Sequence, residues 1–225
     1  MVLRVKALGQ SDRDALVILP GITATREKEA FLKEYFDTHT DYEVFLPRLW
    51  QGLGIRGSAR RLHRFMEARV KPAGYASVHF LSYISGGFIL RAMLSRWPLP
   101  NIGRLVHVRS PLQEQVPGLV ISMHGRVAAF LVKGWMMFDL ASAWKDRLPF
   151  AQTAHPQGLI LERGVSKMAV KLGLKDSDFD GIRNSGKFVV PAANETLVVP
   201  ESHDEAYTSE TMLGRMVSFF KAGKF

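Results

Sequence analysis

The sequence contains no cysteine among its 225 residues. A chain without cysteine has no disulfide, no thiolate ligand for a metal ion and no cysteine nucleophile. Serine, threonine, histidine and carboxylate side chains must therefore carry any chemistry. The seven histidines form no metal-ligand spacing such as His-Glu-x-x-His, so the sequence predicts neither a metal site nor a cofactor.

The sequence also lacks a long hydrophobic run. A membrane-spanning helix needs about 18 or more consecutive apolar residues, and the most apolar region, residues 118–140, is interrupted by His124, Arg126 and Lys133. The first ten residues contain Arg4 and Lys6 where a signal peptide would have an apolar core. We therefore expect a cytoplasmic protein, with a single domain over residues 1–225.

Acidic residues are few, since the sequence contains 21 Asp and Glu but 30 Lys and Arg, which gives a net charge of +9. Such a field attracts nucleic acids, anionic membranes and acidic ligands. The densest basic cluster comprises Arg56, Arg60, Arg61, Arg64, Arg69 and Lys71. A helix over residues 58–70 would bury Leu62, Phe65 and Met66 and turn the arginines to solvent. No helix-turn-helix, zinc-finger or base-stacking pattern accompanies the cluster, so no specific nucleic-acid partner is predicted.

The centre of the sequence places a short strand pattern directly before a buried-helix pattern. Residues 78–81 are an apolar run of strand type, and residues 86–97 are apolar on almost every side. Ser82 and Gly86 lie two positions before and two positions after residue 84. Small residues at these two places are typical of a nucleophile elbow, because strand and helix backbones meet there. The residue at the tip of this turn is Ile84.

Segment 77–92 resembles the Val-x-Leu-Val-Gly-His-Ser-Met-Gly-Gly-Leu-Val-x-Arg-Ala segment of small α/β-hydrolases of the lipase and esterase type. The two segments align without a gap. In this alignment Ser82 replaces a glycine, Tyr83 replaces a histidine at the pocket, and Ile84 replaces the nucleophilic serine. The resemblance implies the hydrolase fold without its nucleophile, and Ser85 is the neighbouring hydroxyl that would have to take over.

A second part of the resemblance follows the strand predicted over residues 15–19. The same hydrolases have a His-Gly turn there, and the next backbone N–H points at the substrate oxygen. The resemblance thus implies that the N–H groups of Ile22 and Ser85 are the oxyanion donors. Pro20 replaces the histidine in the pocket, which removes one N–H but leaves that of Ile22 available. An ordinary strand-to-helix loop is the alternative interpretation.

Candidate acid and base residues follow the elbow in the chain order that α/β-hydrolases use. Phe179-Asp180-Gly181-Ile182 resembles the turn that supplies the catalytic acid in small lipases. His203 lies between the last predicted strand, 196–199, and the last predicted helix, 209–221. The resemblance implies that His203 is the base and faces Ile84, with Asp180 as its orienting partner and Asp178 as the alternative acid.

Six predicted strands alternate with helices along the chain, at residues 15–19, 42–45, 78–81, 102–109, 158–161 and 196–199. This alternation predicts an α/β fold, a mostly parallel sheet with helices on both faces. The resemblance makes it an α/β-hydrolase fold with a small cap insertion at about residues 112–157. Within the insertion, residues 118–140 are open to three interpretations, namely a substrate-facing lid, a helix pair in the core, or a surface that weakly contacts an anionic membrane.

Three functional hypotheses follow from the resemblance. The first is a non-catalytic or repurposed lipase/esterase-like protein that binds a small apolar or acyl-type ligand in the former active site. The second is an active carboxylic ester hydrolase that uses Ser85. The third is an enzyme without a nucleophile, in which His203 and Asp180 act as a general-base dyad.

Overall fold

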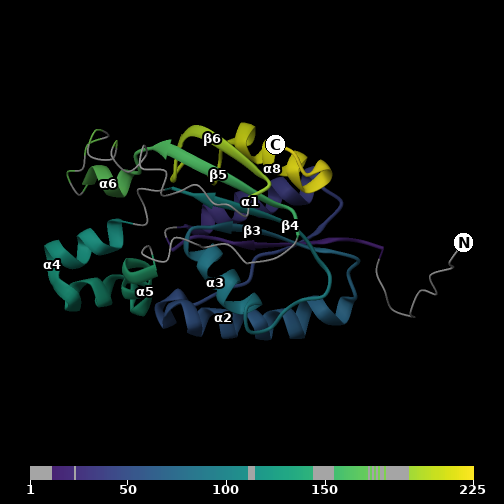
Figure 1. Cartoon of the computed structure of the whole chain (residues 1–225), viewed down its shortest axis with the longest axis horizontal. Coiled ribbons are helices and arrows are strands. Elements are labelled where there is room, and N and C mark those ends of the chain that lie inside the picture. Colours follow the sequence, from purple (N-terminus) through teal and green to yellow (C-terminus); the bar gives the residue numbers. More distant parts are fainter. Residues whose placement is uncertain are drawn as a thin grey trace, which may run out of the picture.

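A computed structural model describes residues 12–22, 24–110, 115–143, 155–171, 173, 175, 177, 180 and 193–225. Its six strands form one parallel sheet in the order β2-β1-β3-β4-β5-β6 (Figure 1). The strands are β1 (Ala15–Leu19), β2 (Glu43–Phe45), β3 (Val78–Tyr83), β4 (Ile102–Arg109), β5 (Gln157–Gly164) and β6 (Glu195–Ser202). The α-helices are α1 (Arg26–His39), α2 (Gly54–Phe65), α3 (Ser85–Leu94), α4 (Val116–Lys133), α5 (Trp135–Ala143), α6 (Lys167–Lys171) and α8 (Glu210–Ala222). Shorter turns are η1 (Gln51–Leu53), the π-helical η2 (Met66–Val70) and η3 (Lys71–Ala73).

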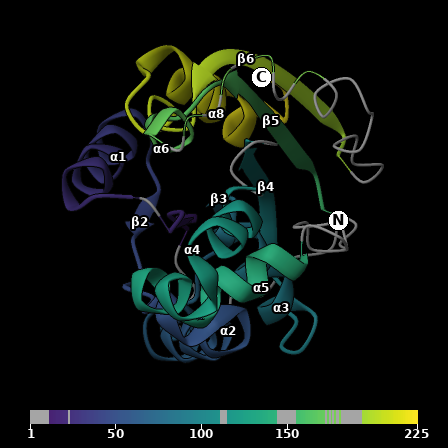
Figure 2. The same ribbon diagram turned by 90° about the vertical axis from the view of Figure 1, so that its left-hand side faces the viewer.

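Each of the six predicted strands is confirmed, and so is the parallel sheet. All five residues of β1 and all six of β3 are buried, because helices cover both faces of a parallel sheet. Alternate residues of a strand point to opposite faces. Val17 of β1 accordingly packs in the core layer beneath α2 and α3, and Ile18 packs in the layer beneath α1 and α8. Figure 2 shows these two pairs of helices on opposite sides of the sheet.

The basic helix α2 has the predicted orientation. Leu62 is fully buried, and Arg56, Arg60, Arg61 and Arg64 are exposed. The helix begins at Gly54, earlier than residue 58, because Asp139 of α5 accepts a 2.7 Å hydrogen bond from the Ile55 N–H. A carboxylate at a helix N-terminus stabilises its unpaired N–H groups. This long-range cap has no local signature in the sequence.

The segment between β4 and β5 contains α4 and α5, which lie beyond the carboxyl ends of the strands (Figure 1). α4 is kinked at Gly125, whose φ of 78° is a conformation that favours glycine. Of the helices described, none combines the length and the hydropathy that crossing a membrane would take. Asp178 lies outside the described residues, as do parts of the predicted cap, residues 112–114 and 144–154.

Candidate functional site

The turn between β3 and α3 has the geometry of an elbow. Ile84 has φ 23° and ψ −88°, and it is the one non-glycine residue with positive φ among the described residues. This conformation is strained for a β-branched residue. Neighbouring hydrogen bonds fix it, since the Ile84 N–H donates to the Val108 carbonyl at 3.0 Å and its own carbonyl accepts from the Gly87 N–H at 3.0 Å.

The small residues on either side of the elbow have a steric reason. A Cβ atom on Gly86 would lie 2.3 Å from the carbonyl oxygen of Leu19, so only glycine fits where α3 crosses β1. Ser82 is buried, and its hydroxyl lies 2.6 Å from Nδ1 of His107 on β4. Burial lowers the pKa of His107 to about 3, and the charge of Arg109 acts in the same direction, whereas the hydrogen bond with Gln157 acts to raise this pKa. The prediction that strand and helix backbones meet closely here is confirmed.

The side chain at the tip of the elbow belongs to the apolar core. Ile84 is buried in the cluster that contains Phe88, Met136 and Leu140. Ile84 thus belongs to the same core cluster as residues of α3 and α5. An aliphatic side chain has neither a lone pair nor a transferable proton, so position 84 offers no nucleophile.

The hydroxyl next to the elbow is engaged in a structural contact. Ser85 is fully buried, and its Oγ donates to Oε1 of Gln51 at 2.8 Å. Nε2 of Gln51 donates in turn to the carbonyl of Pro20 at 3.0 Å. Gln51 thus links the elbow to the loop after β1. The carbonyl of Pro20 helps to position Gln51, a role that the replacement of a histidine by Pro20 did not suggest.

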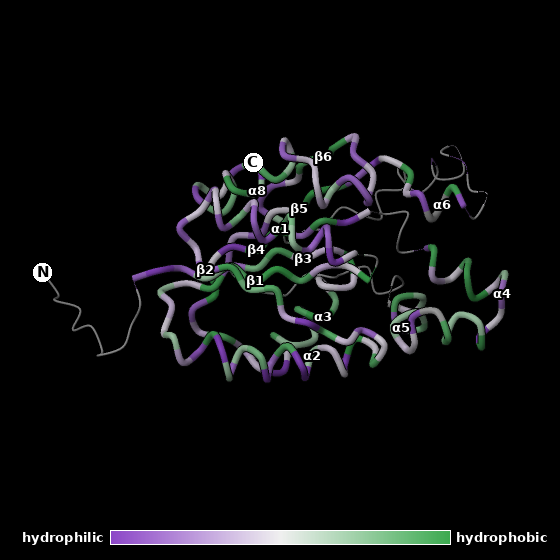
Figure 3. The backbone as a smooth tube through the Cα atoms, turned by 180° about the vertical axis from the view of Figure 1, so that it is seen from behind, coloured by the Kyte–Doolittle hydropathy of each residue, from purple (hydrophilic) through white to green (hydrophobic). Residues whose placement is uncertain are grey.

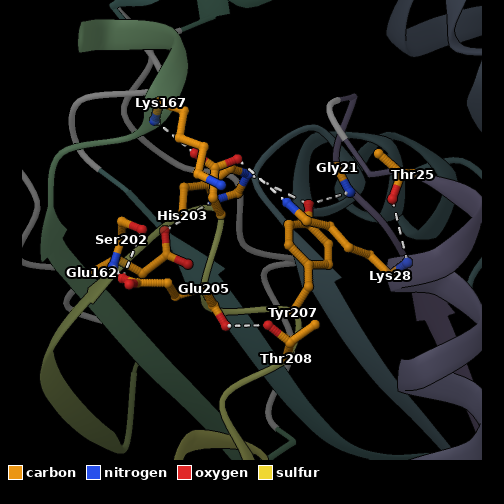
Figure 4. Close-up of polar contacts among 11 residues, drawn as sticks. Gly21, Thr25, Lys28, Glu162, Lys167, Ser202, His203, Glu205, Tyr207 and Thr208 are labelled. Atoms are coloured by element: carbon orange, nitrogen blue, oxygen red, sulfur yellow. Dashed lines mark hydrogen bonds and ion pairs between the residues drawn. The ribbon is translucent and has the colours of Figure 1, made fainter.

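His203 is buried directly after β6, and its ring contacts a carboxylate. Nδ1 lies 3.0 Å from Oε2 of Glu162, which is itself fully buried on β5 (Figure 4). Glu162 is level with Val199 of β6, so the strand pairing brings the acid beside the turn that contains His203. A buried carboxylate needs such a partner, because an unpaired charge in the interior is strongly destabilising.

The carboxylate that contacts the His203 imidazole is that of Glu162, whereas Asp180 was the predicted orienting partner. Asp180 is exposed, whereas Glu162 is fully buried at the imidazole. The sequence did carry a signal, because Glu162 follows the apolar run Leu-Ile-Leu at the carboxyl end of a predicted strand. Residues at the carboxyl ends of neighbouring parallel strands meet at one edge of the sheet.

The other ring nitrogen of His203 faces a tyrosine. Nε2 lies 3.4 Å from the hydroxyl oxygen of Tyr207, and that oxygen accepts a 3.1 Å hydrogen bond from the Gly21 N–H (Figure 4). In the tautomer in which the Tyr207 O–H donates to Nε2, the oxygen still accepts from Gly21 and Nδ1–H is the donor to Glu162. Glu162, His203 and Tyr207 form a continuous buried chain of polar contacts.

Tyr207 is held in place by its neighbours. Its ring stacks on Tyr83 with centroids 4.2 Å apart and an interplanar angle of 14°. The Tyr83 hydroxyl donates to the Ala206 carbonyl at 3.2 Å, and burial raises the pKa of Tyr83 well above its ordinary value. A Cβ atom on Gly21 would lie 2.6 Å from the Tyr207 oxygen, so the absence of a side chain at residue 21 makes room for the phenol.

Salt bridges fix the turn that carries His203 and Tyr207. Asp204 accepts a 2.7 Å hydrogen bond from the Lys167 N–H and pairs with the Lys28 ammonium at 3.3 Å. Burial alone would raise the pKa of Asp204, but these two contacts outweigh it and lower the pKa. Glu205 accepts from both the N–H and the hydroxyl of Ser202 at 2.8 Å, which closes the turn.

A cavity of about 620 Å³ lies next to this chain of contacts, between the loop after β1 and the α4–α5 junction. It is lined by Gly21, Ile22, Ala24, Glu29, Leu49, Trp50, Gln51, Gly52, Leu53, Phe130, Leu131, Lys133, Gly134 and Trp135. Lys133 also donates to the Ile22 carbonyl at 2.8 Å, which ties α4 to the loop after β1. Neither His203 nor Tyr207 is among the lining residues, and the Tyr207 hydroxyl contacts both Nε2 of His203 and the N–H of the lining residue Gly21.

Similar architectures occur among solved structures. An α/β hydrolase enzyme, MGS-MChE2, from the metagenome of sediments of the Mar Chica lagoon is similar over 100% of both chains, with a TM-score of 0.58 and 19% identity. The α/β-hydrolase fold is therefore present. The mature lipase BlEst2 of Bacillus licheniformis (TM-score 0.56, 12% identity, 96% of this chain and 97% of that chain) has it too.

A lipase-esterase related protein of Clostridium acetobutylicum is similar to the same extent (TM-score 0.55, 12% identity, 93% of this chain and 95% of that chain). No protein-family model matches the sequence, and no curated protein matches it. At these identities the likeness concerns the fold. The chain thus has an α/β-hydrolase fold in which His203 is paired with Glu162 and covered by Tyr207.

The roles of Ile22 and Ser85 as oxyanion donors remain predictions. Ile22, whose N–H is a predicted oxyanion donor, lines the cavity of about 620 Å³. Ser85, the other predicted donor, begins α3 directly after the elbow. Among the described residues no cluster of three His, Asp or Glu side chains could hold a metal ion.

Proposed function

We propose that this protein is a lipase/esterase-like member of the hydrolase fold that does not form an acyl-enzyme, and that it binds an apolar or acyl-type ligand in the cavity above the sheet. The observation that carries the proposal is the position of Ile84. Its backbone has the strained geometry of an elbow, and its side chain packs in the core. The acyl-enzyme route requires a nucleophile at that place.

Two further contacts favour the non-catalytic function over turnover at Ser85. The Ser85 hydroxyl donates to Gln51, and the hydroxyl that meets His203 Nε2 is that of Tyr207. A general base must reach the proton that it abstracts. In this arrangement the base reaches a phenol whose oxygen is fixed by the Gly21 N–H.

The lining of the cavity supports the class of ligand. Ile22, Leu49, Phe130, Leu131 and Trp135 provide an apolar wall, and Gln51 and Lys133 add a few polar groups. A volume of about 620 Å³ is within the usual range for small-molecule sites, which are mainly apolar with few polar groups. The two similar structures described as a lipase and as a lipase-esterase related protein make an acyl chain the first ligand to test.

Displacement of a fluorescent fatty acid by unlabelled fatty acids tests the binding. We expect saturable binding that Ala24→Trp weakens about tenfold or more, because the indole would fill part of the cavity. Ala68→Trp, at an exposed position on η2, is the matched control and should bind like the unmodified protein. Equal binding by both variants, or no binding by the unmodified protein, contradicts the proposal.

A general-base enzyme without a nucleophile is a second candidate. The buried pair of His203 and Glu162 favours it, because a positioned imidazole with a carboxylate at Nδ1 is the usual form of a catalytic base. In this candidate Glu162 takes the role that was predicted for Asp180, and Tyr207 would have to move or to transfer the proton itself. A reaction abolished by His203→Gln but insensitive to a fluorophosphonate probe would favour this candidate.

A further inference from the structure

The outer face of α4 is apolar and exposed. Val127 is 75% exposed and Leu131 is 79% exposed, while Ala129 on the opposite face is fully buried. Residues three and four apart share a helix face, so Phe130 joins these two on the outside. Trp135, at the start of α5, is 57% exposed and packs edge-on against Phe130 with ring centroids 5.4 Å apart. These four residues, Val127, Phe130, Leu131 and Trp135, are called the outer face below.

The outer face lies at one end of the molecule. Figure 2 shows α4 and α5 foremost when the molecule is viewed from that end, and Figure 3 shows both helices mainly in the colour of hydrophobic residues. Helix-sized apolar surface is rarely left exposed without a partner. Because the face is an exposed apolar helix surface, it suits a broad apolar layer.

The charged residues of α4 are all basic, and Glu29 is the acidic residue that shares the cavity lining with Phe130, Leu131 and Trp135. Residues 115–138 contain no Asp or Glu, and they contain Arg126 and Lys133. Arg126 is exposed and lies 5.1 Å from the ring centroid of Phe138. On the other side of the cavity, Trp50 is 62% exposed and Arg61 lies over its ring at 5.7 Å. The nearest acidic residue along the chain, Asp139, already accepts the Ile55 N–H.

We propose that the outer face is a docking surface for an anionic lipid bilayer. An apolar helical face flanked by arginine and by exposed tryptophan is the pattern of helices that lie in the membrane interface. The net charge of +9 adds long-range attraction to an anionic surface. This proposal does not depend on the proposed function. Phe130, Leu131 and Trp135 also line the cavity, so docking would place the cavity next to the lipid.

Flotation with vesicles tests the proposal on the full chain. Vesicles of phosphatidylcholine are compared with vesicles that also contain phosphatidylglycerol. We expect the protein to float with the anionic vesicles, to float far less with the neutral ones, and to lose binding as salt is raised. The double substitution Val127→Ser with Leu131→Ser should weaken binding at least about tenfold, because two apolar side chains no longer enter the interface. Arg126→Gln should weaken binding to the anionic vesicles about fivefold.

The control variants make the same kinds of substitution at sites away from the outer face. Val198→Ser removes an exposed valine of β6, and Arg69→Gln removes an exposed arginine of η2. Both should bind vesicles like the unmodified protein. Failure of the unmodified protein to float, or equal flotation of the double variant, overturns the proposal. Self-association that the double variant abolishes, in the absence of vesicle binding, would make the outer face a contact between copies of the chain and also overturns it.

Discussion

The hydroxyl oxygen of Tyr207 lies 3.4 Å from Nε2 of His203 and accepts a hydrogen bond from the Gly21 N–H. This relationship explains how the fold retains a buried imidazole and carboxylate. The phenol satisfies both the ring nitrogen and the loop N–H, so neither is left buried without a partner. Tyr207 therefore connects the imidazole to the loop after β1.

The first prediction concerns this hydroxyl. Tyr207→Phe should lower the free energy of unfolding by about 2 kcal/mol, because the Gly21 N–H and Nε2 of His203 lose their partner. Urea denaturation measures this difference. Tyr35→Phe is the control, since the Tyr35 hydroxyl contacts the Glu210 carbonyl at an exposed site and its loss should cost well under about 1 kcal/mol. Equal losses in the two variants would show that the Tyr207 contacts add nothing to stability.

The second prediction tests the crossing of α3 over β1. Gly86→Ala places a Cβ atom 2.3 Å from the Leu19 carbonyl oxygen, which is backbone and cannot move aside cheaply. We expect a loss of more than about 3 kcal/mol, or a chain that does not fold, in denaturant or thermal unfolding.

The matched control for that substitution is Gly118→Ala on α4. Among the described residues, and apart from its chain neighbours and the backbone of its own helix, nothing lies within 4 Å of a Cβ placed on Gly118, so alanine should be neutral there or should stabilise the protein by up to about 1 kcal/mol. A mild effect of Gly86→Ala would mean that strand and helix can separate at the elbow.

The third prediction concerns pH. His107 is fully buried and its pKa is lowered to about 3 by burial, so the folded protein keeps the ring neutral where the unfolded chain protonates it. The unfolded state then binds more protons below about pH 6.5, and stability is lost as the pH falls from there toward 3. Between pH 7 and pH 5 this one group should cost about 2 kcal/mol.

Urea denaturation at the two pH values of the unmodified protein and of His107→Asn measures this contribution. The asparagine variant should lose about 2 kcal/mol less between pH 7 and pH 5. Ser82→Ala removes the 2.6 Å contact to Nδ1 but leaves the imidazole buried, so it should keep the pH dependence. Identical pH dependence of stability in all three proteins would show that groups other than His107 cause the loss of stability at low pH.

The sequence predicted those parts of the site that depend on local pattern. The strands could be predicted because each is a short apolar run. The elbow could be predicted because Ser82 and Gly86 are small where two backbones cross. His203 was singled out by its place between the last strand and the last helix, and it is buried in the structure.

The parts that were missed depend on contacts between distant segments. Glu162 meets His203 through the pairing of β5 with β6, and no neighbouring residue marks it as the acid. Tyr207 meets Gly21 across 186 positions of the chain. Gln51, in the short turn η1, joins Ser85 to Pro20. Such contacts are set by the sheet order, which the alternation of elements does not specify.

The last prediction tests the elbow residue, Ile84, together with Tyr207, which contacts His203. The unmodified protein should hydrolyse short-chain p-nitrophenyl esters at a negligible rate and should not react with a fluorophosphonate probe, because loss of the nucleophile in a serine hydrolase costs about a millionfold in turnover. Ile84→Ser restores a hydroxyl at the strained turn, and we expect measurable activity and labelling at residue 84. The gain should be limited, since Nε2 of His203 still meets the Tyr207 hydroxyl.

Adding Tyr207→Phe to Ile84→Ser frees Nε2 and the Gly21 N–H, so the double variant should exceed the single variant in turnover. The matched control adds Tyr35→Phe to Ile84→Ser and should equal the single variant. Glu162→Gln should reduce the activity of the double variant by about a hundredfold or more, because the imidazolium formed during acylation loses its carboxylate. Stoichiometric labelling of the unmodified protein at Ser85 would contradict the assignment, since the hydroxyl now bonded to Gln51 would then be the nucleophile.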